Sequence, residues 1–295
     1  MIITELIGGL GNQMFQYALG RVISLRNNDE LKLDISSLVN NTEINTPRQY
    51  ELDVFKVPAE LASKQERKSL GLPNPVTLTL NRYLHTQLNP YPKSLITEGA
   101  HRYHPEIFDH AGDIYLSGYW QTEKYYKGYE KIVRQDFARR ARPISAKNRL
   151  LRHQIEGCNS VSIHVRRGDY VTNPAANAFH GTCDLSYYRR AMKYVERYVK
   201  NPTYFVFSDD SEWAAKNIVN SHKTVYISHN TGHDAHEDIR LMANCKQNII
   251  ANSSFSWWGA WLNNNPDKIV IAPKQWFRDK KTSTKDLIPI TWVRT

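Results

Sequence analysis

The stretch "SVSIHVRRGDY", residues 160–170, passes from a short apolar run directly into two adjacent arginines. The alternating Val and Ile residues of 160–165 predict a buried β-strand. Arg166 and Arg167 then lie just beyond the carboxyl end of that strand. In open parallel sheets, ligands bind beyond the carboxyl ends of the strands. The stretch therefore predicts a strand of a parallel α/β sheet that ends in a site for a doubly negative group.

The same pattern recurs through the second half of the chain. Four further runs are rich in Val, Ile, Phe and Tyr: "TYFVFS" (203–208), "KTVYIS" (223–228), "QNIIAN" (247–252) and "KIVIAP" (268–273). Segments with helical periodicity lie at 185–199, 211–219, 236–245 and 253–262. Buried strands that alternate with amphipathic helices indicate βαβ units, and hence a parallel sheet with helices on both faces.

The first half of the chain alternates in the same way, but less regularly. Strands are predicted at 1–7, 31–36 and 113–120, and helices at 12–27 and 144–157. Residues 41–110, with many Pro, Asn and His, support no clear prediction. A chain of 295 residues exceeds what one core usually organises. We therefore expect two α/β domains, 1–150 and 151–295, with the active site in the cleft between them.

Composition places the chain among ordinary globular proteins. Hydrophobic residues make up 41% of it, and no apolar run approaches the roughly 18–20 residues that span a bilayer. The N-terminus has no signal-peptide pattern. Three cysteines, far apart and without C-x-x-C spacing, indicate free thiols in a reducing cytoplasm. The net charge of +10 fits anionic partners, namely nucleotides, nucleic acid or an acidic membrane surface.

Polar residues follow four of the predicted strands at their carboxyl ends. After the arginine pair comes Asp169; the next strands are followed by Ser208, Asp209 and Asp210, by Ser228, and by Asn252, Ser253 and Ser254. Two guanidiniums suit a pyrophosphate, and the carboxylate of Asp209 or Asp210 can accept two N–H groups of guanine. Ser253 and Ser254 open a helix, whose N-terminus favours phosphate oxygens, although N-capping alone would also explain serines there.

Three other patterns bear on the site. "GGLGNQ" (8–13) joins a strand to a helix and permits close approach of a ligand, without completing G-x-G-x-x-G. "HDAHED" (233–238) has metal-ligating residue types, but acidic residues are also favoured at the helix N-terminus expected there. No D-x-D spacing occurs, so arginines would take the place of a metal at a diphosphate. Trp257, Trp258 and Trp261 are expected to pack in the core.

Four motifs resemble, in order and spacing, those of the α-1,2-fucosyltransferases of glycosyltransferase family 11. They are "GGLGNQMFQYA" (8–18), "HVRRGDY" (164–170), "FVFSDD" (205–210) and "LMANCKQNIIANSSFSWWGAWL" (241–262). The resemblance implies a GT-B-type fold of two Rossmann-like domains, the first on the acceptor side and the second binding the donor. It also implies GDP-β-L-fucose as the donor, no metal, and inversion at the anomeric carbon.

The resemblance assigns donor roles to the predicted residues. Arg166 and Arg167 would bind the diphosphate and stabilise the departing GDP, while His164 and Asp169 would shape their loop. Asp209 or Asp210 would hydrogen-bond guanine. The phosphate and base pocket would be lined by Ser253, Ser254 and Phe255.

On the acceptor side, the resemblance places Gly11, Asn12 and Gln13 near the fucose and the attacking hydroxyl. It implies a terminal galactose of a surface glycan as acceptor, such as an O-antigen repeat on a lipid carrier. Such a carrier would suit a basic cytoplasmic protein at the inner face of a membrane. The candidates for a general base are Asp169, His164 and Asp184, and base-independent transfer is also open.

Two alternatives to a fucosyltransferase stay open at this point. One is a GT-B enzyme that uses another nucleotide sugar. The other is a basic nucleic-acid-binding protein, against which the lack of RNP-like and helix-turn-helix signatures speaks.

Overall fold

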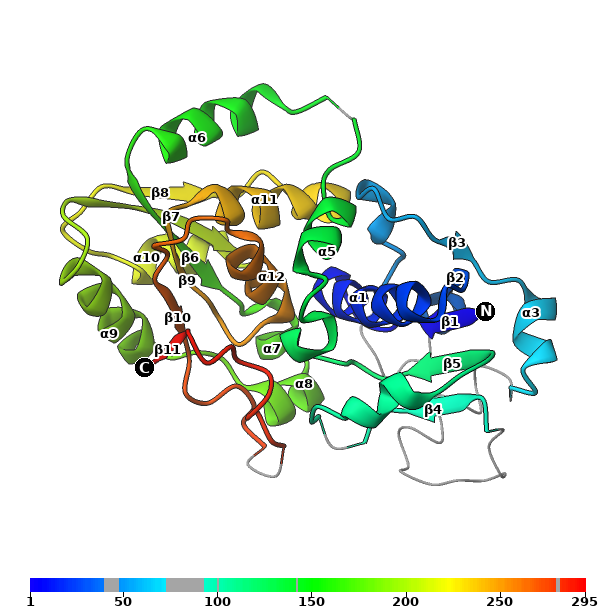
Figure 1. Cartoon of the computed structure of the whole chain (residues 1–295). Coiled ribbons are helices and arrows are strands. Elements are labelled where there is room, and N and C mark those ends of the chain that lie inside the picture. The colour runs from blue at the N-terminus through cyan, green and yellow to red at the C-terminus, as the bar shows by residue number, and fades with distance from the viewer. Residues whose placement is uncertain (40–47, 73–92, 100, 142, 280–281) are drawn as a thin grey trace. The chain divides into compact units, whose positions relative to one another are not determined.

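The computed structural model describes residues 1–39, 48–72, 93–99, 101–141, 143–279 and 282–295. The chain forms two compact units (Figure 1). Unit 1 comprises Met1–Arg140 and Ser283–Leu287, and unit 2 comprises Ala141–Thr282 and Ile288–Thr295. Much of the stretch 41–110, which supports no sequence prediction, lies outside the described residues.

Unit 1 is built on a parallel sheet with the strand order β3-β2-β1-β5-β4. The strands are β1 (Ile2–Glu5), β2 (Leu31–Asp34), β3 (Glu60–Leu61), β4 (Leu95–Thr97) and β5 (Ile114–Ser117). The helices are α1 (Leu10–Asn27), α2 (Ser36–Val39), α3 (Lys64–Ser69) and α5 (Glu130–Asp136), with 3₁₀ turns η1 (Leu52–Val54), η2 (Pro105–Asp109) and η3 (Glu123–Tyr126).

Helix α1 ends where the sequence predicts. Asn28 adopts a left-handed backbone with φ of 50°, a conformation that asparagine tolerates better than most residues. The N–H groups of Asn28 and Asp29 donate to the carbonyls of Leu25 and Ser24, which satisfies the last turn of the helix.

Unit 2 is built on a second parallel sheet, with the order β11-β10-β9-β6-β7-β8. The strands are β6 (Asn159–Val165), β7 (Pro202–Ser208), β8 (Thr224–Ile227), β9 (Gln247–Ile249), β10 (Val270–Ala272) and β11 (Val293–Arg294). The helices are α6 (Ala146–Glu156), α7 (Gly168–Thr172), α8 (Pro174–His180), α9 (Leu185–Glu196), α10 (Ser211–Asn217), α11 (His236–Asn244) and α12 (Ser254–Leu262), with one 3₁₀ turn, η4 (Gly232–Ala235).

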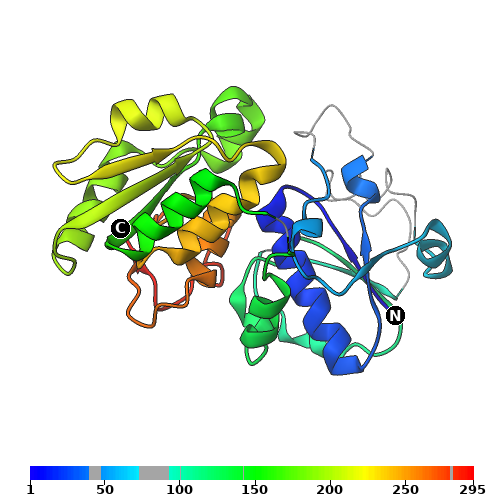
Figure 2. The same ribbon diagram turned by 90° about the horizontal axis from the view of Figure 1, so that it is seen from above.

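The two faces of the unit 2 sheet are covered by different helices. Val161, Ile163 and Val165 of β6 pack with α9 and α10 in one core cluster. The intervening residues of β6 face the other way, where the ring of His164 lies 5.6 Å from that of Phe255 on α12. Helices α6, α11 and α12 lie side by side on this second face (Figure 2).

One sequence prediction is confirmed by this packing. The three tryptophans of α12, at 257, 258 and 261, are buried in the core of unit 2. The three cysteines form no disulfide. Among the helices that the structure describes, none combines the length and apolarity needed to cross a membrane.

The division into units falls ten residues before the expected boundary at 150. Helix α6, which the sequence predicts at 144–157 across that boundary, lies wholly in unit 2. It packs against α11, and Asn148 of α6 donates to Asn230 after β8 at 2.9 Å. A short segment near the C-terminus, Ser283–Leu287, belongs to unit 1, which the sequence did not predict.

Each sheet has a central strand from which the chain proceeds in both directions. β1 lies between β2 and β5, and β6 lies between β9 and β7. The carboxyl end of such a strand is a topological switch point, where open α/β sheets bind ligands. "GGLGNQ" (8–13) follows β1 and "RRGD" (166–169) follows β6, so the predicted motifs occupy both switch points.

Candidate active site

The two arginines after β6 are held by three carboxylates. Arg166 lies 2.6 Å from Oδ1 of Asp169 and 2.9 Å from Oδ2 of Asp209. Arg167 donates from Nε to Oδ2 of Asp210 at 3.0 Å, and its backbone N–H donates to Oδ1 of Asp209 at 2.8 Å. We call these five residues the arginine clamp. Each guanidinium has five N–H donors, so these bonds leave most of the N–H groups of the two arginines without a partner in the described part of the chain.

Aromatic rings support both guanidiniums. Arg166 lies 5.2 Å from the centroid of Tyr170, and Arg167 lies 4.0 Å from that of Trp213. The two arginine side chains are only 23% and 21% exposed, so neither moves freely in solvent. Burial lowers the pKa of Arg166, but Asp209 and Asp169 more than offset this and raise it above its ordinary value. The guanidiniums are therefore permanent, preorganised cations.

Gly168 allows the loop to close on the clamp. A Cβ at this position would lie 2.5 Å from Oδ2 of Asp209, much closer than van der Waals contact. Any side chain here would displace the carboxylate that bonds both arginines. The glycine of the motif is thus required by a close approach between two loops.

Asp209 and Asp210 are engaged by protein groups. Asp209 accepts from both arginines of the clamp. Asp210 also caps α10, because its Oδ1 accepts the backbone N–H of Trp213 at 3.1 Å, while its own N–H donates to Oγ of Ser208 at 2.9 Å. The structure gives both carboxylates a role in positioning arginines. Recognition of guanine by one of them stays a prediction.

His164 is buried beside the clamp. Burial, together with the charge of Arg166, lowers the pKa of this imidazole to about 3. Its Nδ1 has no hydrogen-bond partner among the described residues, and the side chain packs on Phe255. A neutral imidazole with so low a pKa is a weak base at neutral pH. The geometry favours a part in shaping the loop.

The N-terminus of α12 lies after the neighbouring strand β9. Ser253 is the N-cap residue, but its side chain makes no capping hydrogen bond. The first-turn N–H groups of α12 are therefore not satisfied by the usual serine cap. Ser254 is half-buried in the first turn. This arrangement suits an anion at the positive end of the helix.

Asn252 fixes the chain just before that N-terminus. Its Nδ2 donates to the carbonyls of His180 and Gly181, both at 3.1 Å, and to that of Trp276 at 3.0 Å. Its Oδ1 accepts from Sγ of Cys183 at 3.5 Å. The side chain is 2% exposed, so Asn252 joins three segments of unit 2 and does not present itself to a ligand.

The remaining candidates for a general base are engaged as well. Asp184 caps α9: its Oδ1 accepts from Oγ of Ser186 and from the backbone N–H of Tyr187, each at 2.7 Å. The bond from Ser186 and that from Tyr187 lower the pKa of Asp184. Asp169 is paired with Arg166. The residue that acts as a base, if one does, stays a prediction.

In unit 1, the side chains after the glycine loop bind backbone. Gln13 is fully buried and donates to the carbonyls of Gly8 and Gln49 at 3.0 and 2.8 Å, while its Oε1 accepts from Glu51 N–H. Gln16, which the sequence analysis missed, donates to Gly118 and accepts from the N–H of Ile7. Gly11 lies buried in the first turn of α1.

Asn12 differs from Gln13 and Gln16, because its side chain hydrogen-bonds another side chain and not the backbone. Its Oδ1 accepts from Nε2 of Gln121 at 2.8 Å. Ser228, by contrast, lies exposed after β8, and no contact brings it to the arginine clamp within the described residues. The structure therefore brings together the predicted site residues at the carboxyl ends of β6, β7 and β9, but not the one that follows β8.

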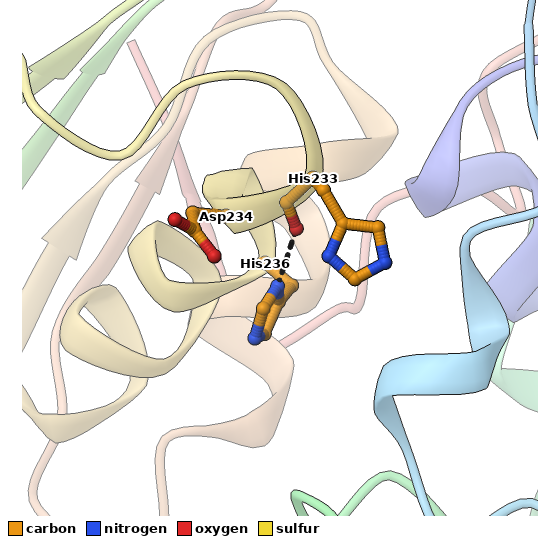
Figure 3. A group of neighbouring side chains, drawn as sticks. All are labelled: His233, Asp234 and His236. Carbon is orange, nitrogen blue, oxygen red and sulfur yellow. Dashed lines mark hydrogen bonds between the residues drawn. The ribbon is translucent and has the colours of Figure 1, made fainter. Parts of the chain in front are cut away.

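Among the residues that the structure describes, His233, Asp234 and His236 form a group with metal-ligating atoms close together. Figure 3 shows that Nδ1 of His236 bonds the carbonyl oxygen of His233, at 2.8 Å. The other ring nitrogen of His236 lies 3.3 Å from Glu237. Both ring nitrogens of His236 are thus engaged by protein groups, and we assign no metal to the cluster.

Asp238, the last residue of "HDAHED", is half-buried on α11, and the sequence did not indicate its unusual environment. Its Oδ1 accepts from Nδ2 of Asn230 at 2.7 Å, and burial raises its pKa to about 7. Asn230 in turn accepts from Asn148, so the residue ends a chain of side-chain bonds between α11 and α6. The pattern gave no signal because acidic residues are common at helix N-termini.

The raised pKa of Asp238 predicts an unusual dependence of stability on pH. Between its ordinary pKa and about 7, the folded state keeps a proton that the unfolded state has lost, so stability falls as pH rises through this window. Asp238→Asn should remove this effect. Relative to the wild type, the variant should gain about 2 kcal/mol in free energy of unfolding between about pH 5.5 and about pH 8. Urea denaturation at both pH values measures it, with the exposed Asp234→Asn as control; equal pH profiles for wild type and D238N would contradict it.

Two Rossmann-like units, with an arginine pair beyond the central strand of unit 2, have the architecture of a GT-B-type glycosyltransferase. The chain belongs to glycosyltransferase family 11, whose sequence profile matches residues 107–295. It is 36% identical to an α-1,2-colitosyltransferase of Escherichia coli over 100% of this chain and 98% of that protein. It is 32% identical to the O-antigen biosynthesis glycosyltransferase WbnK of Escherichia coli, over 94% and 95% of the two chains.

The fold also matches a solved structure. The crystal structure of NodZ α-1,6-fucosyltransferase soaked with GDP-fucose superimposes with a TM-score of 0.53. The match covers 88% of this chain and 91% of that one at 14% identity, and it bears on the fold alone. The predicted GT-B-type fold and the predicted family are confirmed.

Proposed function

We propose that the protein transfers L-fucose from GDP-β-L-fucose to the 2-hydroxyl of a terminal galactose, with inversion to an α-1,2 linkage. The observation that carries the proposal is the arginine clamp at the switch point of unit 2, beside the N-terminus of α12, where the side chain of Ser253 makes no capping hydrogen bond. Membership of glycosyltransferase family 11 and the motif resemblance to α-1,2-fucosyltransferases support it.

The clamp suits the leaving group of such a transfer. As the bond between C1 of the sugar and the phosphate oxygen breaks, GDP gains negative charge, and Arg166 and Arg167 are fixed cations that stabilise it. The N–H groups that open α12 would bind further phosphate oxygens. In this proposal the arginines supply the charge that a divalent metal supplies in other glycosyltransferases, so the transfer requires no metal.

A second donor is favoured by one specific observation. The protein at 36% identity is named for colitose, which is 3-deoxy-L-fucose. Both sugars have the same ring configuration at the other carbons, and the same diphosphate site would serve both GDP-sugars. Selection between them would depend on whether a protein group hydrogen-bonds the 3-hydroxyl.

The acceptor belongs to the proposal as well. An O-antigen enzyme among the similar proteins favours a surface polysaccharide repeat, and a lipid-linked acceptor would place the protein at the inner face of a membrane. The net charge of +10 favours such an anionic surface.

Donor profiling tests the proposal. Thermal shift and transfer to a β-galactoside are measured with GDP-fucose, GDP-colitose, GDP-mannose and a UDP-sugar, each with and without EDTA. GDP-fucose should give the highest kcat/KM, at least about tenfold above GDP-colitose, because one buried polar contact discriminates by about that factor. Preference for GDP-colitose would establish the second donor, and preference for GDP-mannose or a UDP-sugar would refute both. Loss of activity with EDTA would contradict the metal-free mechanism.

A further inference from the structure

The segment that follows the two arginines of the clamp contributes nothing to the core. Residues 168–180 form the short helices α7 and α8, and neither helix has a buried residue. Of the three aromatic side chains in this segment, Tyr170 and His180 are half-buried, while Phe179 is exposed. The contacts of the two half-buried rings therefore matter more for the position of this segment than core burial does.

The ring of Tyr170 contacts both Arg166 and His180. The guanidinium of Arg166 lies over this ring, 5.2 Å from its centroid. The imidazole of His180 is stacked on the same ring, with the two centroids 4.5 Å apart and the two planes within 3° of parallel. An aromatic face attracts a cation, and a stacked neighbour limits how far the ring can tilt. Arg166 is thus held in part by a ring that is itself held in place.

His180 is anchored in turn by a segment near the C-terminus. Its ring lies 5.7 Å from that of Phe277, which also contacts the ring of Phe179 at 4.9 Å. The backbone N–H of Arg278 donates to the carbonyl of Phe179 at 2.8 Å, and its guanidinium donates to Oδ1 of Asn177 at 2.7 Å. These contacts fix α8, so the stacked pair of Tyr170 and His180 has a firm base.

Tyr170 also contacts the chain just before α12. Its hydroxyl donates to the backbone carbonyl of Asn252 at 3.4 Å, a long hydrogen bond. The side-chain amide of Asn252 donates to the carbonyl of His180 at 3.1 Å. Asn252 directly precedes Ser253, the N-cap residue of α12. Tyr170 is therefore connected to both parts of the diphosphate site in the proposed function, namely Arg166 and the start of α12.

A contact with an aromatic ring suits the task of Arg166 better than carboxylates alone. Asp169 and Asp209 lie 2.6 and 2.9 Å from its guanidinium. A bound diphosphate competes with these carboxylates for the same N–H groups. The face of the Tyr170 ring attracts the cation without depending on those hydrogen bonds. The ring can therefore keep the guanidinium in place while its hydrogen bonds pass to a phosphate.

We propose that Tyr170 is a positioning residue for the sugar transfer. Its ring fixes Arg166 where the guanidinium meets the leaving diphosphate, and the stacked ring of His180 makes that position rigid. The inference rests on the proposed function, which assigns the diphosphate to Arg166. It adds two residues outside the arginine clamp to the donor site, and it gives α7 and α8 a function that core packing does not.

Kinetics with the GDP-sugar test the role of the ring. Tyr170→Leu should lower kcat/KM about tenfold, because Arg166 keeps its charge but loses its place. Tyr170→Phe keeps the ring and should stay within about twofold of wild type, since only a long hydrogen bond is lost. Tyr198→Leu makes the same change at an exposed tyrosine of unit 2, and this matched control should leave kcat/KM unchanged.

His180→Ala provides a second variant that does not depend on the folding of Y170L. It removes the stacked ring but keeps the backbone carbonyl that Asn252 binds. It should lower kcat/KM about threefold, as expected for the loss of one aromatic pair. Melting temperatures are measured for all variants, and kinetics are recorded at a temperature where each is folded.

A double-mutant cycle shows whether Tyr170 acts through Arg166. It compares wild type, Y170L, R166A and the double variant, by kcat/KM and by calorimetric titration with inorganic pyrophosphate at low ionic strength. With Arg166 present, Y170L should raise the Kd for pyrophosphate about fivefold; in the R166A background it should change neither quantity by more than about twofold. A residue that only supports folding would give the same loss in both backgrounds.

The inference and the proposed function fail in different ways. A wild type that binds pyrophosphate but turns over no GDP-fucose would refute the proposed donor, while pyrophosphate binding would still decide the role of Tyr170. Wild-type kinetics and pyrophosphate affinity in both Y170L and H180A would overturn the positioning role. So would an equal loss from Y170L with and without Arg166, because Tyr170 would then act on the ligand or the fold and not on the arginine.

Discussion

Replacing Arg166 with alanine is expected to lower kcat/KM for the GDP-sugar by about 10²–10³-fold. The guanidinium is fixed on Asp169 and Asp209 and permanently charged, so in the proposed reaction it would stabilise the departing diphosphate without reorganising. Removing one such preorganised donor typically costs about 3–4 kcal/mol of transition-state stabilisation. Steady-state kinetics with varied donor measure the loss, and calorimetric titration with GDP measures how much of it is ground-state binding.

Three variants identify the cause of that loss. Arg166→Lys keeps the charge but not the planar fork, and should recover only part of the activity. The double variant Arg166→Ala/Asp209→Asn removes the carboxylate that the single variant leaves uncompensated. If repulsion by Asp209 were the whole effect, the double variant would regain wild-type activity; we expect it to remain at least about tenfold impaired. Arg152→Ala, an exposed arginine paired with Glu156, serves as the matched control. Activity within a few-fold of wild type for R166A would refute the clamp's role.

Much of the fold could be predicted because its strands are buried on both faces. The run at 160–165 alternates Val and Ile with small or polar residues, and the run at 203–208 is nearly continuous in β-branched and aromatic residues. Strands β6 and β7 each begin one residue before the predicted start and end where predicted. The two shortest strands were missed. β3 and β11 have two residues each, too few to show any period.

The short helices α7 and α8 were missed for a related reason. Neither has a buried residue to mark an apolar face, so their helical form depends on local caps and not on periodicity. Asn173 caps α8, with its Oδ1 accepting from Ala175 and Ala176. That signal is visible in the sequence only once a helix is already assumed.

The candidate site, like the fold, could be predicted only in part. The position of Arg166 and Arg167 at a strand end could be predicted because they directly follow a buried run, while their role at the donor stays a prediction. The roles of Asp209, Asn252 and Gln13 could not, because each depends on which backbone or arginine the fold brings within 3 Å or so. From the sequence alone, a polar residue at a strand end that binds a ligand cannot be told from one that hydrogen-bonds other groups of the protein.

The substitution Asn252→Asp tests how much a polar residue of this kind contributes to the stability of unit 2. The change is nearly isosteric, but it removes both N–H donors and turns a carboxylate toward the carbonyls of His180, Gly181 and Trp276. The site is buried, so three carbonyls lose their donor and face either a charge or a proton taken up at a cost. Unit 2 should lose about 3–5 kcal/mol in free energy of unfolding.

Urea denaturation followed by tryptophan fluorescence measures this loss, because every tryptophan except Trp120 lies in unit 2. Asn217→Asp is the matched control, since that side chain donates to a single carbonyl, that of Trp213, and is half-buried; it should cost about 1 kcal/mol or less. Asn252 also fixes the backbone before Ser253, so N252D should weaken GDP binding at temperatures where unit 2 is still folded. If N252D were fully stable but bound GDP weakly, Asn252 would instead contact the ligand. If N252D were fully stable and bound GDP normally, the bonds of Asn252 to the three carbonyls would not contribute to stability.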